Sequence, residues 1–212
     1  MEELNLIQKI AIYALPVLLA ITLHEAAHAY AAKRFGDATA YMMGRMTLNP
    51  LKHIDPVGTV LLPLLSVVLG GFLFGWAKPV PVNFGALRNP RVGMRWVAAA
   101  GPAANLVMAI MWVLLLKLAV VMDNDYSRPL ALMSQAGIGI NVVLMVLNLM
   151  PILPLDGGRI LESLLPRRLA YRFSRLEPYG MWILLALVFT GLLSPLLRPF
   201  TTMVYELLGF LL

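Results

Sequence analysis

The sequence contains no cysteine and few charged residues. None of its 212 residues is cysteine, three are histidine, and Asp, Glu, Lys and Arg together make up 13%, about half of the roughly 25% found in soluble domains. The lack of cysteine excludes disulfide bonds, thiol catalysis and zinc fingers built on cysteine. Apolar residues make up 60% and the mean hydropathy is +0.79, which is more apolar surface than a chain of this length buries in one core. The composition therefore predicts a membrane protein whose main solvent is lipid.

The basic residues gather in short segments between the apolar runs. The chain has 17 Lys and Arg residues against 11 Asp and Glu residues, but they do not form the continuous basic face of a nucleic-acid-binding protein, so no nucleic acid partner is expected. They concentrate in 33–52, 88–95 and 167–175, as is typical of cytoplasmic loops. We therefore expect a multi-pass protein of the cell membrane with these segments in the cytoplasm. The N-terminus and the loop near 123–125 are then expected outside.

Apolar runs long enough to span a bilayer, about 20 residues each, recur along the chain. The expected spans are 6–32, 57–76, 96–122, 130–155 and 179–193, followed by a shorter apolar piece at 200–212. The sequence thus predicts an all-α polytopic membrane protein with about five to six transmembrane helices. One domain is expected over 1–212, with a catalytic core at about 6–165 and C-terminal helices at 179–212.

Segment 57–87 is expected to differ from an ordinary membrane pass. Its second half contains Lys78-Pro-Val-Pro-Val-Asn83, whose alternating prolines cannot continue a helix and favour an extended edge strand. Both ends of 53–88 are expected in the cytoplasm, so the chain would enter and return as a re-entrant segment, with a full single pass as the alternative. The strand could hold an unwound substrate by β-augmentation, or it could form a plug that seals a cavity.

Two of the three histidines flank a glutamate within the first apolar run. In His24-Glu25-x-x-His28, the four-residue spacing puts both imidazoles on one helical face, where they can bind a single ion. Glu25 lies beside that face, where it can take a proton from a zinc-activated water. The alternative is a pair of structural histidines hydrogen-bonded in a helix core. Ionisable side chains in a lipid-spanning segment are costly and usually functional, which favours a metal site.

A catalytic zinc usually has three protein ligands and one open position, so a third ligand is needed. Most carboxylates fall in loops or near the termini, and Asp156 is the best candidate because apolar residues precede it. Pro151 and Pro154 break the fourth run just before it and could let the chain dip toward the histidines. Gly157 and Gly158 allow a close approach. Asp156 could also be an N-cap for a helix that starts at Gly157, and the two roles are compatible.

Four further polar residues are candidates for supporting roles. The Asn148 amide could donate to a substrate carbonyl or its developing oxyanion, or it could make a hydrogen bond between helices. Asn105 and Asn141 are expected to bond between helices. His53 could be a loop residue at the membrane interface or part of a gate near the site.

Several motifs occur together over roughly residues 20–160. They are His24-Glu25-x-x-His28, Asn148-x-x-Pro151, Leu155-Asp156-Gly157 and Gly101-Pro102-x-x-Asn105. This combination resembles the site-2 protease family of intramembrane zinc metalloproteases, in a small form without a PDZ insertion or a C-terminal regulatory domain. The resemblance implies one zinc ion per chain held by His24, His28 and Asp156, with Glu25 as general base. It also implies that a transmembrane protein is cleaved within the bilayer.

The sequence therefore predicts an intramembrane zinc metalloprotease with its active site toward the cytoplasmic side of the lipid bilayer. The main alternative is a membrane zinc-binding or transport protein without proteolytic activity, whose histidines serve ion passage. Glu25 between the two histidines favours hydrolysis. A single set of three ligands also favours it, because a carrier would place polar residues on several spans.

Overall fold

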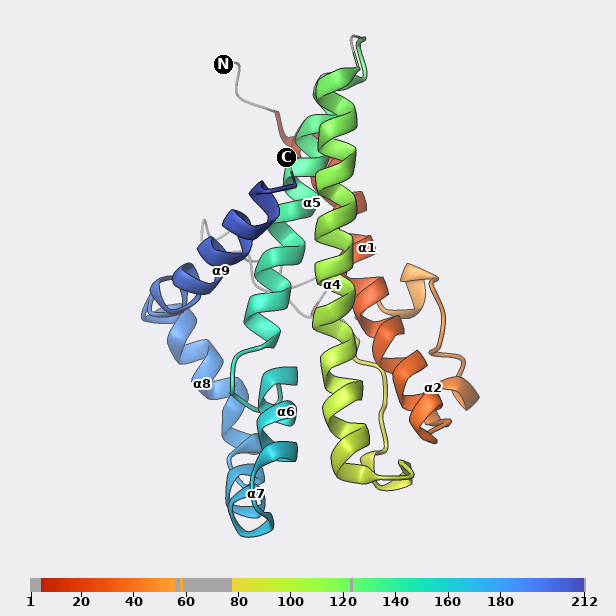
Figure 1. Ribbon diagram of the computed structural model, residues 1–212, viewed down its shortest axis with the longest axis vertical. Coiled ribbons are helices and arrows are strands. Elements are labelled where there is room, and N and C mark those ends of the chain that lie inside the picture. Colours follow the sequence, from red (N-terminus) through yellow and green to blue (C-terminus); the bar gives the residue numbers. More distant parts are fainter. Residues whose placement is uncertain (1–4, 56–57, 59–77, 123, 212) are drawn as a thin grey trace.

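Three long helices form the centre of the protein (Figure 1). The computed structural model describes residues 5–55, 58, 78–122 and 124–211. The long helices are α1 (Leu6–Phe35), α4 (Pro90–Val121) and α5 (Ser127–Asn148), and each packs against the other two. Each is long and apolar enough to cross a bilayer. The predicted all-α fold is confirmed for the described residues, none of which lies in a β-strand.

Shorter helices lie around this centre. They are α2 (Thr39–Met42), η1 (Pro50–Lys52), η3 (Phe84–Ala86), α6 (Asp156–Leu164), α7 (Arg167–Ser174), α8 (Glu177–Phe189) and α9 (Leu193–Gly209). The helices α8 and α9 qualify as a membrane span only as a pair and are bent by 89°, with Gly191 between them at a left-handed φ of 72°. The described residues thus contain three candidate spans, or up to four with this bent pair, which is fewer than the five to six predicted. The expected span at 57–76 lies outside the described residues, apart from residue 58.

The ends of α1 and α4 follow from their capping residues. Asn5 and Gln8 form a reciprocal capping box at the start of α1, and Gly36 ends this helix with a φ of 113°, which favours glycine. The Asn89 side chain accepts a hydrogen bond from the Val92 N–H at the start of α4. These local signals fix both ends of α1 and the start of α4.

The apolar core lies mainly between α4 and α5. Gly137 of α5 lies against the ring of Trp112 on α4, because a β-carbon added to Gly137 would come within 2.3 Å of that ring. Along the last turns of α4, by contrast, large apolar side chains are exposed, among them Leu114, Leu118 and Val121. Such an apolar surface outside the core suits a lipid environment.

A tight turn connects α5 to α6 and returns the chain toward α1. The fourth apolar run ends as a helix at Asn148, and α6 begins at Asp156, after the two prolines. A β-carbon on Gly157 would lie 2.1 Å from the Leu149 carbonyl oxygen. A β-carbon on Gly158 would likewise lie 2.6 Å from the Ile152 carbonyl carbon. Only residues without a side chain fit at these two positions, so both glycines allow a close approach, which is to the turn that precedes them. Asp156 is the first residue of α6, and the N-cap position belongs to Leu155, so the predicted N-cap role of Asp156 is wrong by one residue.

Segment 78–83 is not helical, as its alternating prolines predict. Among the described residues it pairs with no strand, and its N–H groups bond to side chains and to one loop carbonyl instead. It is therefore an extended connection rather than a paired edge strand. Most of the re-entrant path expected for 57–87 lies outside the described residues and stays a prediction.

The basic segments gather at one end of the helical bundle. In Figure 1 the end of α1, the start of α4 and helices α6 and α7 lie at one end, whereas the N-terminus and the α4–α5 connection lie at the other. Lys33 and Arg34 occupy the last turn of α1, and Arg167, Arg168 and Arg172 lie in α7. Positive charge on one side of a membrane protein is typical of its cytoplasmic face.

Candidate metal centre

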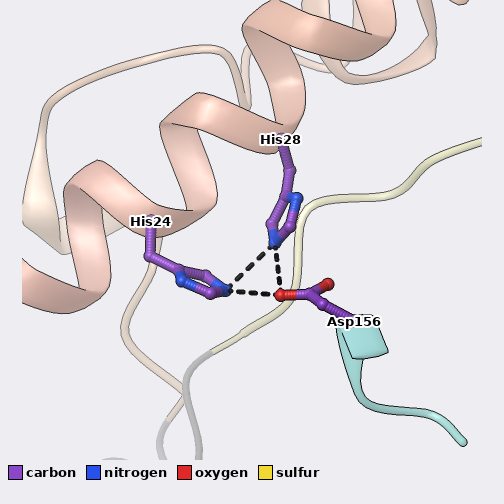
Figure 2. Close-up of side chains that lie close together, drawn as sticks. All are labelled: His24, His28 and Asp156. Atoms are coloured by element: carbon purple, nitrogen blue, oxygen red, sulfur yellow. Dashed lines mark hydrogen bonds and ion pairs between the residues drawn. The ribbon is translucent and has the colours of Figure 1, made fainter. Parts of the chain in front are cut away.

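Three side chains from two helices converge on one point (Figure 2). His24 and His28 project from the same face of α1, and Asp156 comes from the first turn of α6. The Nε2 atoms of the two histidines lie 3.0 Å apart, and each lies 3.3 Å from the Asp156 Oδ2 atom. The structure thus brings together the three residues that the sequence singled out as candidate metal ligands, and among the described residues they form the one such group.

Hydrogen bonds around the histidines fix which ring nitrogen carries the proton. The His28 Nδ1 atom lies 2.7 Å from the Val97 carbonyl oxygen, which can only accept, so this nitrogen donates. Asn105 donates its amide protons to the Ala20 carbonyl and to Asn141. Its Oδ1 atom, 2.6 Å from the His24 Nδ1 atom, therefore accepts. In the neutral imidazoles both Nε2 atoms then carry lone pairs that point at the shared centre.

The geometry and the chemistry of these three residues fit a zinc ion. Bond lengths of about 2.0–2.1 Å in a tetrahedral site separate neighbouring ligand atoms by about 3.4 Å, close to the 3.0–3.3 Å observed. Two nitrogen lone pairs and a carboxylate oxygen repel one another unless a cation or a proton lies between them. The Asp156 Oδ2 atom is also buried without a hydrogen-bond donor among the described residues. Two imidazoles and a carboxylate form a ligand set that zinc accepts.

Gly101 of α4 provides the space for the two imidazoles. A β-carbon built on Gly101 would lie 2.4 Å from the His28 Nε2 atom and 2.5 Å from the His24 Cε1 atom. Any side chain at this position would therefore displace both rings. The sequence analysis did not predict this role of Gly101. Its four-residue spacing from Asn105 is a signal that could have indicated it, because residues four apart share one face of a helix.

Glu25 lies between the two histidines in sequence, but its carboxylate is not part of the group formed by His24, His28 and Asp156. Its side chain is half-buried, and its Oε2 atom accepts a hydrogen bond of 2.7 Å from the backbone N–H of Val80. The sequence alone gave no sign of this contact. The carboxylate is therefore oriented by segment 78–83.

The remaining predicted residues occupy separate places. Asn105 and Asn141 are fully buried and bond to each other between α4 and α5, so the predicted helix–helix role is confirmed, and the His24 contact is an addition.

The Asn148 Nδ2 atom donates to the Leu144 carbonyl within α5, and its proposed contact with substrate stays a prediction. His53 is a buried loop residue whose Nε2 atom lies 3.0 Å from the Thr47 carbonyl oxygen, and its placement at the membrane interface or in a gate stays a prediction.

Comparison with known proteins assigns the family. The family model described as "Peptidase family M50" matches residues 120–191, which include Asp156. The "Putative zinc metalloprotease YwhC" of Bacillus subtilis is 41% identical over 187 residues, covering 86% of this chain and 82% of that protein. The chain belongs to peptidase family M50. The resemblance to site-2 proteases is therefore confirmed.

Mycobacterial relatives give the same result. The "Putative zinc metalloprotease Rip2" of Mycolicibacterium smegmatis is 35% identical over 198 residues, covering 91% of this chain and 71% of that protein. Its counterpart in Mycobacterium tuberculosis is 34% identical over 149 residues, covering 68% of this chain and 54% of that protein. No solved structure matches the chain significantly. The protein is thus a member of a metalloprotease family, with apolar helices suited to a membrane.

Proposed function

We propose that this M50 family member is an intramembrane zinc metalloprotease that hydrolyses peptide bonds of transmembrane proteins. The observation that carries the proposal is the convergence of His24, His28 and Asp156 on one point, with the half-buried Glu25 next to His24 in α1. Two neutral imidazoles, one carboxylate and a nearby base are the parts that a zinc hydrolase needs.

In this proposal His24, His28 and Asp156 hold one zinc ion per chain. Val97 and Asn105 hold the imidazoles in the tautomer that leaves both Nε2 atoms free for the ion. Such outer hydrogen bonds orient metal ligands and raise their affinity. When bound, the zinc ion supplies Lewis acidity, which polarises a carbonyl and lowers the pKa of water.

Glu25 moves the proton. Its carboxylate accepts a proton from the attacking water as the new carbon–oxygen bond forms. The same group then gives this proton to the nitrogen of the leaving amine as the carbon–nitrogen bond breaks. One residue thus acts as base and then as acid, and after hydrolysis it returns to its starting charge. Its position beside the histidine face, rather than in the ligand set, leaves it free for this transfer.

The location of the site favours a substrate within the membrane. His24 lies nine residues before Lys33 in α1, which corresponds to about 13 Å along a helix at 1.5 Å per residue. The site therefore lies inside the bundle, away from its basic end and toward the middle of the membrane. A single-span protein could reach it at that depth. Because basic residues mark the cytoplasmic face, we place the active site toward that side of a multi-pass protein.

The experiment that tests this function compares wild-type protein with Glu25→Gln in detergent, using a panel of single-span substrates. Glutamine keeps the shape of glutamate but cannot act as a base, so hydrolysis should fall by about 10²-fold or more. Zinc measured on the same preparations should remain unchanged, because Glu25 is not a ligand in this scheme. Glu162→Gln in α6 is the matched control and should retain activity.

Two results would contradict the proposal. Cleavage retained in Glu25→Gln would remove this residue from the reaction. Zinc flux across vesicles carrying wild-type protein, together with no cleavage of any substrate, would favour the zinc-transport alternative.

A further inference from the structure

A single peptide N–H of segment 78–83 is directed at Glu25. The Val80 nitrogen lies 2.7 Å from the Glu25 Oε2 atom, a distance typical of hydrogen bonds to a charged acceptor. Pro79 and Pro81 flank Val80 and have no N–H of their own. Val80 therefore carries the only backbone donor of these three residues.

The chain before Val80 is anchored independently of Glu25. The Lys78 N–H donates to the His53 carbonyl over 3.0 Å. The buried Arg45 side chain donates through Nη2 to the Lys78 carbonyl over 2.9 Å and to the Pro79 carbonyl over 3.4 Å. The Pro79 carbonyl belongs to the same peptide group as the Val80 N–H, and the Lys78 carbonyl belongs to the group before it, so these bonds fix the donor directly.

The chain after Val80 is anchored as well. The Asn83 N–H donates to the Asp37 Oδ2 atom over 2.7 Å, and Asp37 also accepts two hydrogen bonds from Thr39. The Val80 side chain is itself buried against Ala29 and Ala40. Because the donor is held from both sides and by its own side chain, it orients the flexible glutamate rather than the reverse.

The two carboxylate oxygens of Glu25 are thereby distinguished. Oε2 receives the Val80 N–H, which leaves Oε1 as the oxygen that can face the reacting groups. A glutamate side chain has several rotatable bonds, and its disorder would lower the fraction of time that it spends in a productive position. A fixed backbone donor removes this disorder without adding a second titratable group.

We propose that the Val80 peptide N–H is a positioning group that holds Glu25 for proton transfer, an inference that rests on the proposed protease function. Oε1 accepts the proton as the water O–H bond breaks and the new C–O bond forms. The same oxygen returns this proton to the amine as the C–N bond breaks. The Val80 N–H stays on Oε2 through both steps, so it never exchanges its own proton with the substrate.

Two substitutions distinguish the contribution of the Val80 N–H to activity from that of the Val80 side chain. Val80→Pro removes the N–H within a segment that already alternates with proline, and Val80→Ala keeps the N–H while removing most of the side chain. We expect Val80→Pro to lower kcat by about 10- to 100-fold, the range for loss of a charge-assisted hydrogen bond, with KM and zinc content unchanged. Val80→Ala should retain at least ten times more of kcat than Val80→Pro.

A second readout does not depend on activity. In zinc-loaded protein labelled with ¹⁵N-valine, the Val80 amide proton should resonate downfield and move upfield in Glu25→Ala. It should not move in Glu162→Ala, the matched loss of a carboxylate on α6. Retained kcat in Val80→Pro, equal losses in Val80→Pro and Val80→Ala, or an amide shift insensitive to Glu25 would each overturn the inference. If the shift depends on Glu25 but the wild type cleaves no substrate, the contact stands and the proposed protease function fails, taking the catalytic purpose of the contact with it.

Discussion

Replacing Gly101 with alanine should abolish the metal centre while leaving the fold intact. The added β-carbon would lie 2.4, 2.5 and 2.6 Å from three atoms of the two imidazoles, whereas ordinary contacts of such a carbon begin at about 3.4 Å. The rings would have to move by about 1 Å, against a tolerance of about 0.2 Å in metal–ligand distances. Changes in residues that merely support a ligand cost about 10- to 100-fold in affinity. Displacing two ligands at once should therefore cost at least 100-fold, or about 2.7 kcal/mol.

The assay is competition with a zinc chelator in detergent, with thermal unfolding measured on the same samples. Gly139→Ala in α5 is the matched control, because its β-carbon would meet only the Tyr205 hydroxyl at 3.6 Å, an ordinary contact. We expect wild-type zinc affinity in Gly139→Ala and severe loss in Gly101→Ala. A Gly101→Ala protein that binds zinc within a few-fold of wild type would show that the imidazoles do not occupy these positions in the loaded protein.

Three further predictions concern other parts of the chain. Asn105→Ala should lower zinc affinity by about 10- to 100-fold in the same assay, because His24 loses the acceptor that fixes its tautomer. Burial disfavours the charged form of Asp37, but three hydrogen bonds to its carboxylate outweigh burial and hold its pKa below the ordinary value of 3.8. The lowered pKa stabilises the folded protein above pH 3.8, and this stability is lost as the pH falls through the lowered pKa. Acid should therefore lower the unfolding temperature of the wild type more steeply than that of Asp37→Asn. Cysteines placed at Asp125 and Ala170 should label from opposite sides of the membrane, and labelling of both from one side would contradict the predicted topology.

The sequence was sufficient for the fold class and for the residues of the candidate centre. Apolar runs gave the three long helices, since the lipid requirement sets their length and composition. The four-residue spacing placed His24 and His28 on one face of α1. The apolar residues around Asp156 pointed to it as the third ligand, because most other carboxylates fall in loops or near the termini. The proline break before Asp156 was also informative, because only a break lets α6 turn back toward α1.

Contacts between distant parts of the chain could not be predicted. The Asn105 bond to His24 joins residues 81 positions apart, and the Val80 bond to Glu25 joins residues 55 positions apart. Such pairs depend on how α1, α4 and segment 78–83 pack, which no local pattern encodes. The described residues contain three or four candidate spans, and the lower number has a related reason. Apolar composition alone does not show that the chain bends by 89° between α8 and α9.

The most direct test of the central claim is a measurement of zinc content and zinc ligation in purified wild-type protein and in Asp156→Ala. Metal analysis of the wild type should give about one zinc ion per chain. X-ray absorption at the zinc edge should show two imidazoles and further oxygen at about 2.0–2.2 Å. Asp156→Ala should lose most of this zinc, whereas Glu162→Ala, which removes a neighbouring carboxylate of α6, should keep it. Undiminished zinc in Asp156→Ala, or a zinc spectrum without two imidazoles, would contradict the account.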